Sequence, residues 1–281
     1  MARFIDPRVD WAFKRIFGSE DTKECLITFL NGLFEDELVI KDVTFAKTEK
    51  LGLRPDDRGV VFDVYCITNE GKHVIVEMQK KEQEYFADRA LYYTARAIVQ
   101  QGIRGIWDYH LAPVYTVCFM DFVSQSPMLK EFRTDLVLTD LQTRQRVSDR
   151  MRIVYLQLPL FDKHTEAECM DIFDCWIYIV KNMNMFEQMP FSEKYPVFRK
   201  LAEIGDLRKL SREELELYDE DIKNMRDIYA TRKFDEKKGM EIGMAKGMEK
   251  GMAKGMAKGM AKGMEKEKLA TARRLLSMGL S

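Results

Sequence analysis

The hydrophobic pattern between residues 60 and 79 predicts two β-strands, Val60–Ile67 and His73–Gln79. The residues between them, Asn69-Glu70-Gly71, are typical of a hairpin turn. Apolar side chains occur on both faces of each strand, which is the pattern of strands buried between layers. We therefore expect this hairpin in the interior of the fold.

The same patterning predicts helices and strands on either side of the hairpin. Asp6 and Pro7 favour the start of a first helix, and Gly18 favours its end. The other expected elements are helices at 21–34 and 84–101 and strands at 39–47, 114–122 and 151–160. A helix between the third and fourth strands permits a parallel crossover, which is normally right-handed. The order of elements therefore predicts an α/β fold.

Two acidic residues of the hairpin lie among apolar neighbours. Side chains alternate faces along a strand, so Glu77 and Gln79 point the same way. With a loop of odd length centred on Glu70, Asp63 is directly opposite Glu77, with Cβ atoms roughly 5 Å apart. Burying carboxylates is costly unless they are paired or bind a metal, and hard divalent cations prefer such oxygen ligands. These residues are a candidate metal site; the alternative is a pair of carboxylates on a solvent-facing side of the strands.

The second half of the chain has a different character. Residues 162–232 show helical spacing of aromatic residues and leucine, with a break expected at 191–196. From Gly239 the chain repeats Gly-Met-x-x seven times. On a helix this period makes the methionine stripe drift by about 40° per repeat, and each glycine costs nearly 1 kcal/mol relative to alanine. We expect a marginally helical or flexible basic tail, and leave open a self-associating helix or a nucleic-acid-binding arm.

Charge and cysteine content narrow the class of protein. Residues 236–281 hold 11 basic and 5 acidic residues, a net charge of +6, whereas the first 235 residues carry −7. Proteins that bind nucleic acid over their whole surface are usually more basic than this, so such contacts must come from local patches, the metal site or the tail. Five scattered cysteines without a C-x-x-C pair indicate free thiols in an intracellular protein. The sequence shows no apolar leader and no run of about 18 apolar residues, so we expect a cytoplasmic protein without a membrane segment.

Taken together, four features resemble the PD-(D/E)xK nuclease family transposases, the Rpn-type recombination-promoting nucleases. They are Asp10-x-x-Phe13-Lys14-x-x-Phe17 followed by Phe29-Leu30-Asn31, Asp63 on its strand, Glu77-Met78-Gln79, and a helix with Arg89 and Tyr92-Tyr93 leading into a strand that ends in Asp121-Phe122. The resemblance covers roughly residues 5–125 and the repeat tail. It implies a restriction-endonuclease-like αβββαβ core with a mixed sheet. We expect this nuclease-like core at 1–160, a helical region at 161–235 and a helical or flexible repeat tail at 236–281.

The resemblance also implies an activity, the Mg²⁺- or Mn²⁺-dependent hydrolysis of DNA phosphodiesters. Asp63, Glu77 and the backbone carbonyl of Met78 would hold the metal, and Gln79 would orient the attacking water. Gln79 stands where the wider superfamily has lysine, and a glutamine amide supplies no charge. The family itself tends to have glutamine here, so the departure is from the superfamily.

Two further residues are candidate accessory groups of this site. Asp10 is either an outer carboxylate or an exposed helix partner of Lys14, four residues away. Arg89 is either a phosphate ligand or part of a surface ion pair.

Two functions from different classes follow. The first is a metal-dependent DNA endonuclease linked to transposition or recombination of mobile elements, or to defence. DNA is then the partner, and a homo-oligomer is expected, because two sites cut both strands of a duplex most easily. The alternative is a nuclease-fold protein with weak or no activity that serves as a binding or assembly module and oligomerises through its repeat tail.

Overall fold

The computed structural model describes residues 2–35, 37–50, 59–102 and 105–278. Their contacts divide the chain into two compact units, Met1–Ile222 and Lys223–Ser281. Helix α6 (Arg212–Ser277) begins in the first unit and continues through the second. None of the described helices is both long and apolar enough to cross a membrane.

The first unit is built on a six-stranded mixed sheet in the order β1-β4-β5-β6-β8-β7. Its strands are β1 (Val43–Phe45), β4 (Val64–Thr68), β5 (His73–Gln79), β6 (Val114–Met120), β7 (Arg133–Thr139) and β8 (Arg146–Gln157). The pairs β5–β6 and β6–β8 are parallel and the others antiparallel. The predicted parallel crossover after the third core strand is therefore confirmed, with α3 (Phe86–Val99) between β5 and β6.

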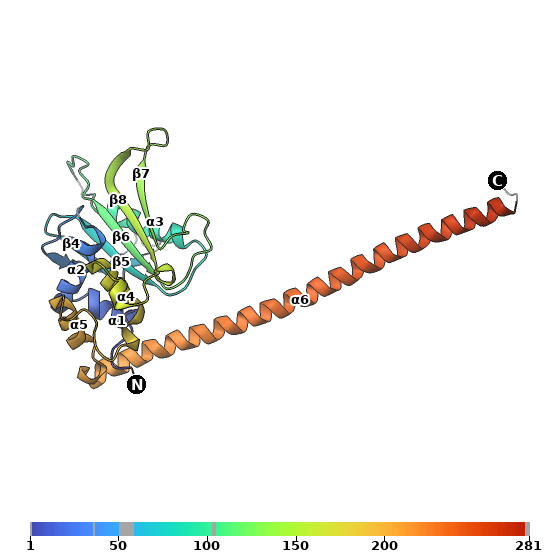
Figure 1. Cartoon of the computed structure of the whole chain (residues 1–281). Helices are drawn as coiled ribbons and strands as arrows, with labels where there is room; N and C mark the ends of the chain where they lie inside the picture. Colours follow the sequence, from blue (N-terminus) through green and yellow to red (C-terminus); the bar gives the residue numbers. More distant parts are fainter. Residues whose placement is uncertain (1, 36, 51–58, 103–104, 279–281) are drawn as a thin grey trace. The chain divides into compact units, whose positions relative to one another are not determined.

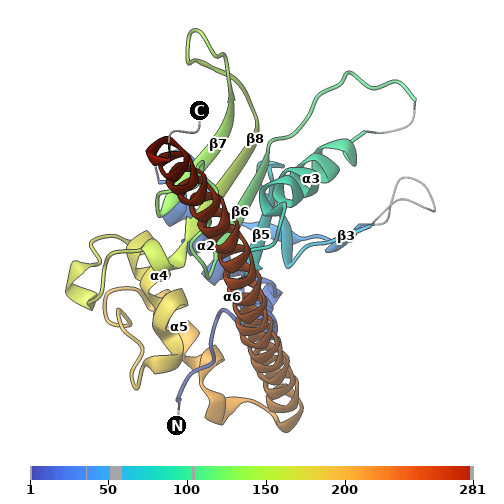
Figure 2. The ribbon, with the colours of Figure 1, turned by 90° about the vertical axis from the view of Figure 1, so that its right-hand side faces the viewer.

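Helices cover both faces of this sheet (Figures 1 and 2). Besides α3, the first unit contains α1 (Asp10–Phe17), α2 (Lys23–Leu33), α4 (Ile172–Asn182) and α5 (Pro196–Gly205). The ring of Phe119 on β6 packs against Phe13 of α1 and Phe29 of α2, at centroid distances of 5.7 and 5.0 Å. Helices α4 and α5 in turn pack against α1 and α2. These four helices therefore share one face of the sheet, and α3 covers the other.

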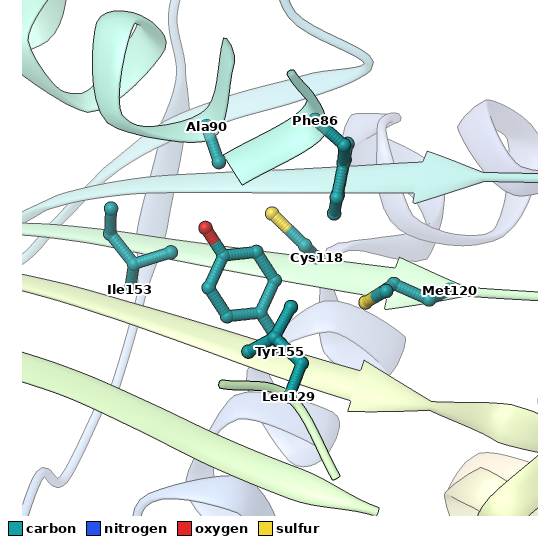
Figure 3. Close-up of a cluster of buried hydrophobic side chains, with 7 residues drawn as sticks. All are labelled: Phe86, Ala90, Cys118, Met120, Leu129, Ile153 and Tyr155. Carbon is teal, nitrogen blue, oxygen red and sulfur yellow. The ribbon is translucent and has the colours of Figure 1, made fainter. Parts of the chain in front are cut away.

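Between α3 and the sheet lies a hydrophobic cluster (Figure 3). It joins two residues of α3 to side chains of β6, β8 and the segment after β6: Phe86, Ala90, Cys118, Met120, Leu129, Ile153 and Tyr155. Phe86 and Tyr155 meet edge to face with ring centroids 5.8 Å apart, a geometry that aromatic quadrupoles favour. Phe86 and Ala90 are four residues apart, so one face of α3 is fixed on the sheet. This packing determines which α3 side chains remain exposed.

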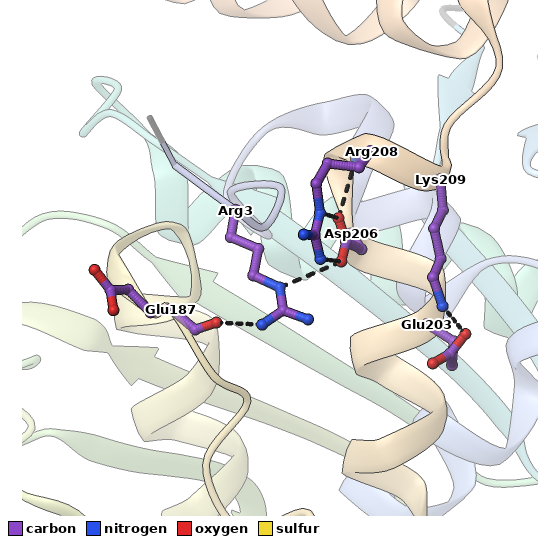
Figure 4. Close-up of polar contacts among 6 residues, drawn as sticks. All are labelled: Arg3, Glu187, Glu203, Asp206, Arg208 and Lys209. Atoms are coloured by element: carbon purple, nitrogen blue, oxygen red, sulfur yellow. Dashed lines mark hydrogen bonds and ion pairs between the residues drawn. The ribbon is translucent and has the colours of Figure 1, made fainter.

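The N-terminal segment is anchored to the chain that follows α5 (Figure 4). Arg3 donates to Asp206 Oδ2 at 3.3 Å and to the carbonyl of Glu187 at 2.6 Å. Arg208 donates through two guanidinium nitrogens to the same buried Asp206, and this pairing holds the pKa of Asp206 well below its usual range. Glu203 and Lys209 form a further ion pair beside it. Residues beyond 161 are thereby tied to the sheet-containing part of the first unit.

Several expected boundaries differ in the structure. The first helix begins at Asp10 rather than at Asp6. The Asp6 carboxylate accepts hydrogen bonds from the backbone and the guanidinium of Arg8, at 3.0 and 2.9 Å, so it closes a turn ahead of the helix. The strand expected at 39–47 is shorter in the structure, where β1 covers only Val43–Phe45. The break expected at 191–196 is confirmed, because α5 begins at Pro196.

The outer hairpin of the sheet was only partly predicted. Strand β7 has no buried residue, and β8 begins at Arg146 with an exposed first half. The expected strand at 151–160 therefore covers only the buried second half of β8. The apolar run of β7, Leu136–Leu138, has only three residues, and such a short run does not by itself predict a strand.

The second unit is the continuation of α6. Of the two states expected for the repeat tail, helical or flexible, the structure shows a helix through all seven Gly-Met-x-x repeats. The repeat methionines are exposed, between 60% for Met264 and 76% for Met240. Within the described residues, the methionine side chains of the repeats are thus not packed against other parts of the chain.

Candidate active site

Asp63 and Glu77 meet where the ladder between β4 and β5 ends. The register pairs Val64 with Val76, so one further step places Asp63 opposite Glu77, as predicted from the odd-length loop. The backbone N–H of Asp63 donates to Glu77 Oε1 at 3.2 Å. The backbone N–H of Met78 donates to Asp63 Oδ2 at 2.8 Å. Each carboxylate is therefore hydrogen-bonded to the strand that carries the other.

The strand expected at Val60–Ile67 is not continuous. It divides into β3 (Val60–Val61), which pairs with β2 (Glu49–Lys50), and β4, with a bend at Asp63. Phe62 donates its backbone N–H to the carbonyl of Thr48 at 3.1 Å. Because the chain leaves the ladder here, the backbone of Asp63 bonds to a side chain of β5 instead of to its backbone. The bend thus opens the edge of β5 at Glu77 and Met78.

Burial and mutual repulsion shape the electrostatics of the pair. Glu77 is only 3% exposed. Its burial, followed by the charge of Asp63, raises the pKa of Glu77 to about 8. Burial also raises the pKa of Asp63, although the hydrogen bond from Met78 opposes that rise. Two carboxyl groups in this position hold a proton near neutral pH unless a cation compensates their charge.

Two cationic side chains approach the acidic pair. The Nη2 atom of Arg89, on α3, lies 3.7 Å from Glu77 Oε2. The Arg89 guanidinium also stacks over the ring of Tyr93, 5.2 Å from its centroid. The charge of Lys14, on α1, lowers the pKa of both Asp63 and Glu77. Arg89 is thus an ion-pair partner of a buried carboxylate within the site.

Gln79 lies two residues beyond Glu77 on β5, with its side chain on the same face. It is 7% exposed, and its backbone carbonyl accepts the N–H of Asp121 at 2.8 Å. Within the described part of the chain, the Gln79 amide has no hydrogen bond to another side chain or to the backbone. The amide is therefore available to a water molecule or a bound group beside the carboxylates.

Asp10 is held mainly by its helix neighbour. Its Oδ2 accepts from Lys14 Nζ at 2.8 Å, the expected pair four residues apart, and both side chains are about half exposed. The charge of Asp10 nevertheless raises the pKa of Asp63. The start of α1 therefore contributes one acidic and one basic group to the field at the site.

Lys14 has a place near this site that was not predicted. In the sequence it is the partner of Asp10 and a member of the motif Asp10-x-x-Phe13-Lys14-x-x-Phe17, and neither pattern assigns it to the acidic pair. The effect of its charge on both carboxyl groups depends on contacts between distant segments, which periodicity along one helix does not encode.

Side chains supply only some of the ligands that a hard divalent cation needs at this site. Among the described residues, no group of three or more His, Cys, Asp and Glu side chains is placed to hold a metal ion. Asp63 and Glu77 supply carboxylate oxygens, and the rise that burial causes in the pKa of both groups is offset only in part by the charges of Arg89 and Lys14. A cation held here would complete its coordination with a backbone carbonyl, water and substrate oxygens.

Comparison with protein-family models matches residues 7–233 to the model described as PD-(D/E)XK nuclease family transposase. The match includes α1, the hairpin with Asp63 and Glu77, α3, the later helices and the first third of α6. The comparisons with curated proteins and with solved structures gave no match.

Proposed function

The chain belongs to the PD-(D/E)XK nuclease family transposases, whose family model covers most of it, and we propose that it is a metal-dependent endonuclease that hydrolyses DNA phosphodiesters. One observation carries the proposal. Asp63 and Glu77 meet at the open edge of β5, each hydrogen-bonded to the strand of the other. A structural role alone would not favour two repelling carboxylates in a buried position.

Three groups would hold the metal, Mg²⁺ or Mn²⁺. They are the carboxylates of Asp63 and Glu77 and the backbone carbonyl of Met78. Within a strand, the N–H and C=O of one residue point to the same side. The Met78 N–H points to Asp63, so its carbonyl faces the same open edge, where the chain of β4 has bent away. When bound, the ion polarises a phosphate oxygen and lowers the pKa of a bound water.

The remaining residues position the reactants. The Gln79 amide orients the attacking water, because it lies on the face of Glu77 and has no other partner in the described chain. Arg89 compensates the charge of Glu77 before substrate enters and then contacts a phosphate oxygen, for which guanidinium geometry is suited. Lys14 supplies positive charge from α1, and Asp10 acts as the accessory carboxylate that keeps Lys14 in place.

Plasmid cleavage with Mg²⁺ tests this function. We expect nicked and linear products from the wild-type protein and none from Asp63→Ala or Glu77→Ala. Glu70→Ala is the matched control, since Glu70 is an exposed carboxylate on the turn of the same hairpin, paired with Lys72. Calorimetric titration with Mg²⁺ or Mn²⁺ should show binding that weakens strongly in Glu77→Gln. Cleavage that survives both alanine substitutions would place the active site elsewhere.

A second function, assembly through the tail, is favoured by the exposed methionines of α6. Exposed apolar rows often mark a binding surface. In this proposal the chain forms a homo-oligomer through the repeats, either to bring two nuclease sites to one duplex or as a module without activity. Absence of cleavage with any divalent ion, together with an oligomer in light scattering, would favour the module. The DNA target that the protein cuts determines which biological process it serves: transposition, recombination or defence.

A further inference from the structure

A pocket of about 410 Å³ opens beside the acidic pair, between β3 and the start of α3. Its described wall is formed largely by α3 and by the three residues just before this helix. The residues there that bear on its chemistry are Tyr85, Asp88, Arg89, Tyr92 and Tyr93, with Val60 opposite. Arg89 belongs both to this pocket and to the ion pair with Glu77. The pocket and the carboxylates are therefore adjacent.

Among the described residues, three tyrosines line the pocket. Tyr92 and Tyr93 lie three and four residues beyond Arg89 on α3 and so share its side of the helix, whereas Tyr85 precedes α3 as its N-cap, with a left-handed φ of 65°. Tyr85 is 69% and Tyr92 42% exposed, which is high for large rings. Tyr93 lies beneath the Arg89 guanidinium. The rings of Tyr85 and Tyr92 are thus the exposed flat surfaces at the pocket, while Arg89 covers the ring of Tyr93.

The charges that line the pocket limit which chemical groups can bind in it. Among the described residues that line the pocket, Glu84 and Asp88 carry carboxylates and Arg89 carries positive charge, and Arg89 is already paired with Glu77. A phosphate group inside it would be repelled by the two carboxylates. A neutral, planar ring with amino groups fits better, because it stacks on tyrosine and donates to a carboxylate.

We propose that this pocket receives an unpaired nucleobase of the DNA strand whose phosphate lies at Asp63 and Glu77. The inference rests on the proposed function and adds a substrate class, namely duplexes with unpaired or distorted positions, or single strands. Arg89 connects the two sites, with its guanidinium between the stacked base and the phosphate. A base inside a perfect duplex would have to leave its stack to enter, which costs free energy that a mismatched base does not pay.

Fluorescence anisotropy with labelled DNA tests this inference. The full-length protein is titrated in EDTA, so that no strand is cut, onto a perfect duplex and onto the same duplex with an internal mismatched bubble. We expect tighter binding to the bubble. Tyr92→Ala and Tyr85→Ala should each weaken bubble binding by roughly five- to a hundredfold, the range for loss of one base–aromatic stack, with little change for the perfect duplex. Tyr92→Phe, which keeps the ring, should bind as the wild type does.

Tyr109→Ala is the matched control, since Tyr109 is 78% exposed but packs on Trp107, away from the pocket. Equal affinity of the wild-type protein for bubble and perfect duplex, or equal losses for both in Tyr92→Ala, would overturn the inference. If plasmid cleavage persisted in that case, the proposed nuclease function would stand without it. Failure to bind any DNA in EDTA, together with failure to cleave any DNA with Mg²⁺, would remove both. A Tyr85→Ala variant that fails to unfold cooperatively is replaced by Tyr92→Ala, which leaves the start of α3 unchanged.

Discussion

At the scale of single residues, the protonation of Glu77 links the stability of the protein to its metal site. Burial and the charge of Asp63 raise its pKa to about 8 in the folded protein, against 4.5 for an ordinary glutamate. Without a metal, the folded state therefore holds a proton that the unfolded chain releases above about 4.5. A cation bound between the two carboxylates would displace this proton, so metal affinity should rise with pH.

This linkage gives the first prediction. The stability that Glu77 contributes through its raised pKa is complete below about 4.5 and is lost as the pH rises through about 8. In EDTA, the melting temperature of the wild-type protein should therefore fall over this range by more than that of Glu77→Gln. Added Mg²⁺ at the upper end should restore the wild type only. Parallel pH profiles for the two proteins would show that Glu77 does not titrate in this range.

Gln79 gives the second prediction. Gln79→Ala removes the amide that orients water and should lower the cleavage rate by something like a hundredfold, a typical scale for a positioning or acid–base group. Gln79→Lys places the charged group of the wider superfamily at the same point and should retain or raise activity. Both rates are measured on plasmid at saturating Mg²⁺, with thermal unfolding as a check on folding. A wild-type rate in Gln79→Ala would make Gln79 only a residue of the strand.

At the scale of elements, the close approach of α2 and α4 depends on Gly32. A Cβ atom at this position would lie 2.9 Å from Ile172 Cγ2 and 3.2 Å from the backbone nitrogen of Phe173. Because part of this contact is backbone, the helices cannot relieve it by changing one rotamer. Phe173 in turn packs against Phe29 of α2, with ring centroids 6.3 Å apart.

We therefore expect Gly32→Ala to lower the free energy of unfolding by about 1–3 kcal/mol, the usual cost of overpacking. Urea denaturation measures this change. Gly251→Ala is the matched control, because a Cβ there meets nothing within 4 Å and alanine favours a helix by about 1 kcal/mol over glycine. A neutral or stabilising Gly32→Ala would mean that α2 and α4 separate easily.

The hairpin of β4 and β5 was predictable because its determinants are local. A period of two and an odd loop fix which residues oppose each other, so Asp63 and Glu77 could be paired from the sequence alone. The bend at Asp63 was not predicted, since the chain there pairs with the two-residue strand β2 at Glu49–Lys50, which shows no hydrophobic pattern. Lys14 was not predicted for a different reason, because its helix reaches the site through packing between distant segments, which leaves no periodic trace.

At the scale of the whole molecule, α6 serves two parts of the chain differently. Its first turns belong to the first unit: the Tyr218 hydroxyl accepts the backbone N–H of Asp6 at 2.9 Å, and Asp221 accepts that of Trp11 at 2.8 Å. The repeats beyond it expose their methionines and carry the excess of positive charge. Removing the repeats should therefore leave the first unit folded, whereas removing the first turns of α6 as well should destabilise it.

Truncation after Lys238 keeps Tyr218 and Asp221 and should leave the thermal transition of the first unit in place. Truncation after Ser211 removes both bonds to the N-terminal segment and should lower or abolish that transition. The shorter deletion also removes most of the basic excess, so DNA affinity should fall and depend less on salt concentration. If the repeats mediate self-association, light scattering should show the full-length oligomer become a monomer in the same variant. Loss of the thermal transition on truncation after Lys238 would instead make the repeats part of the folded core.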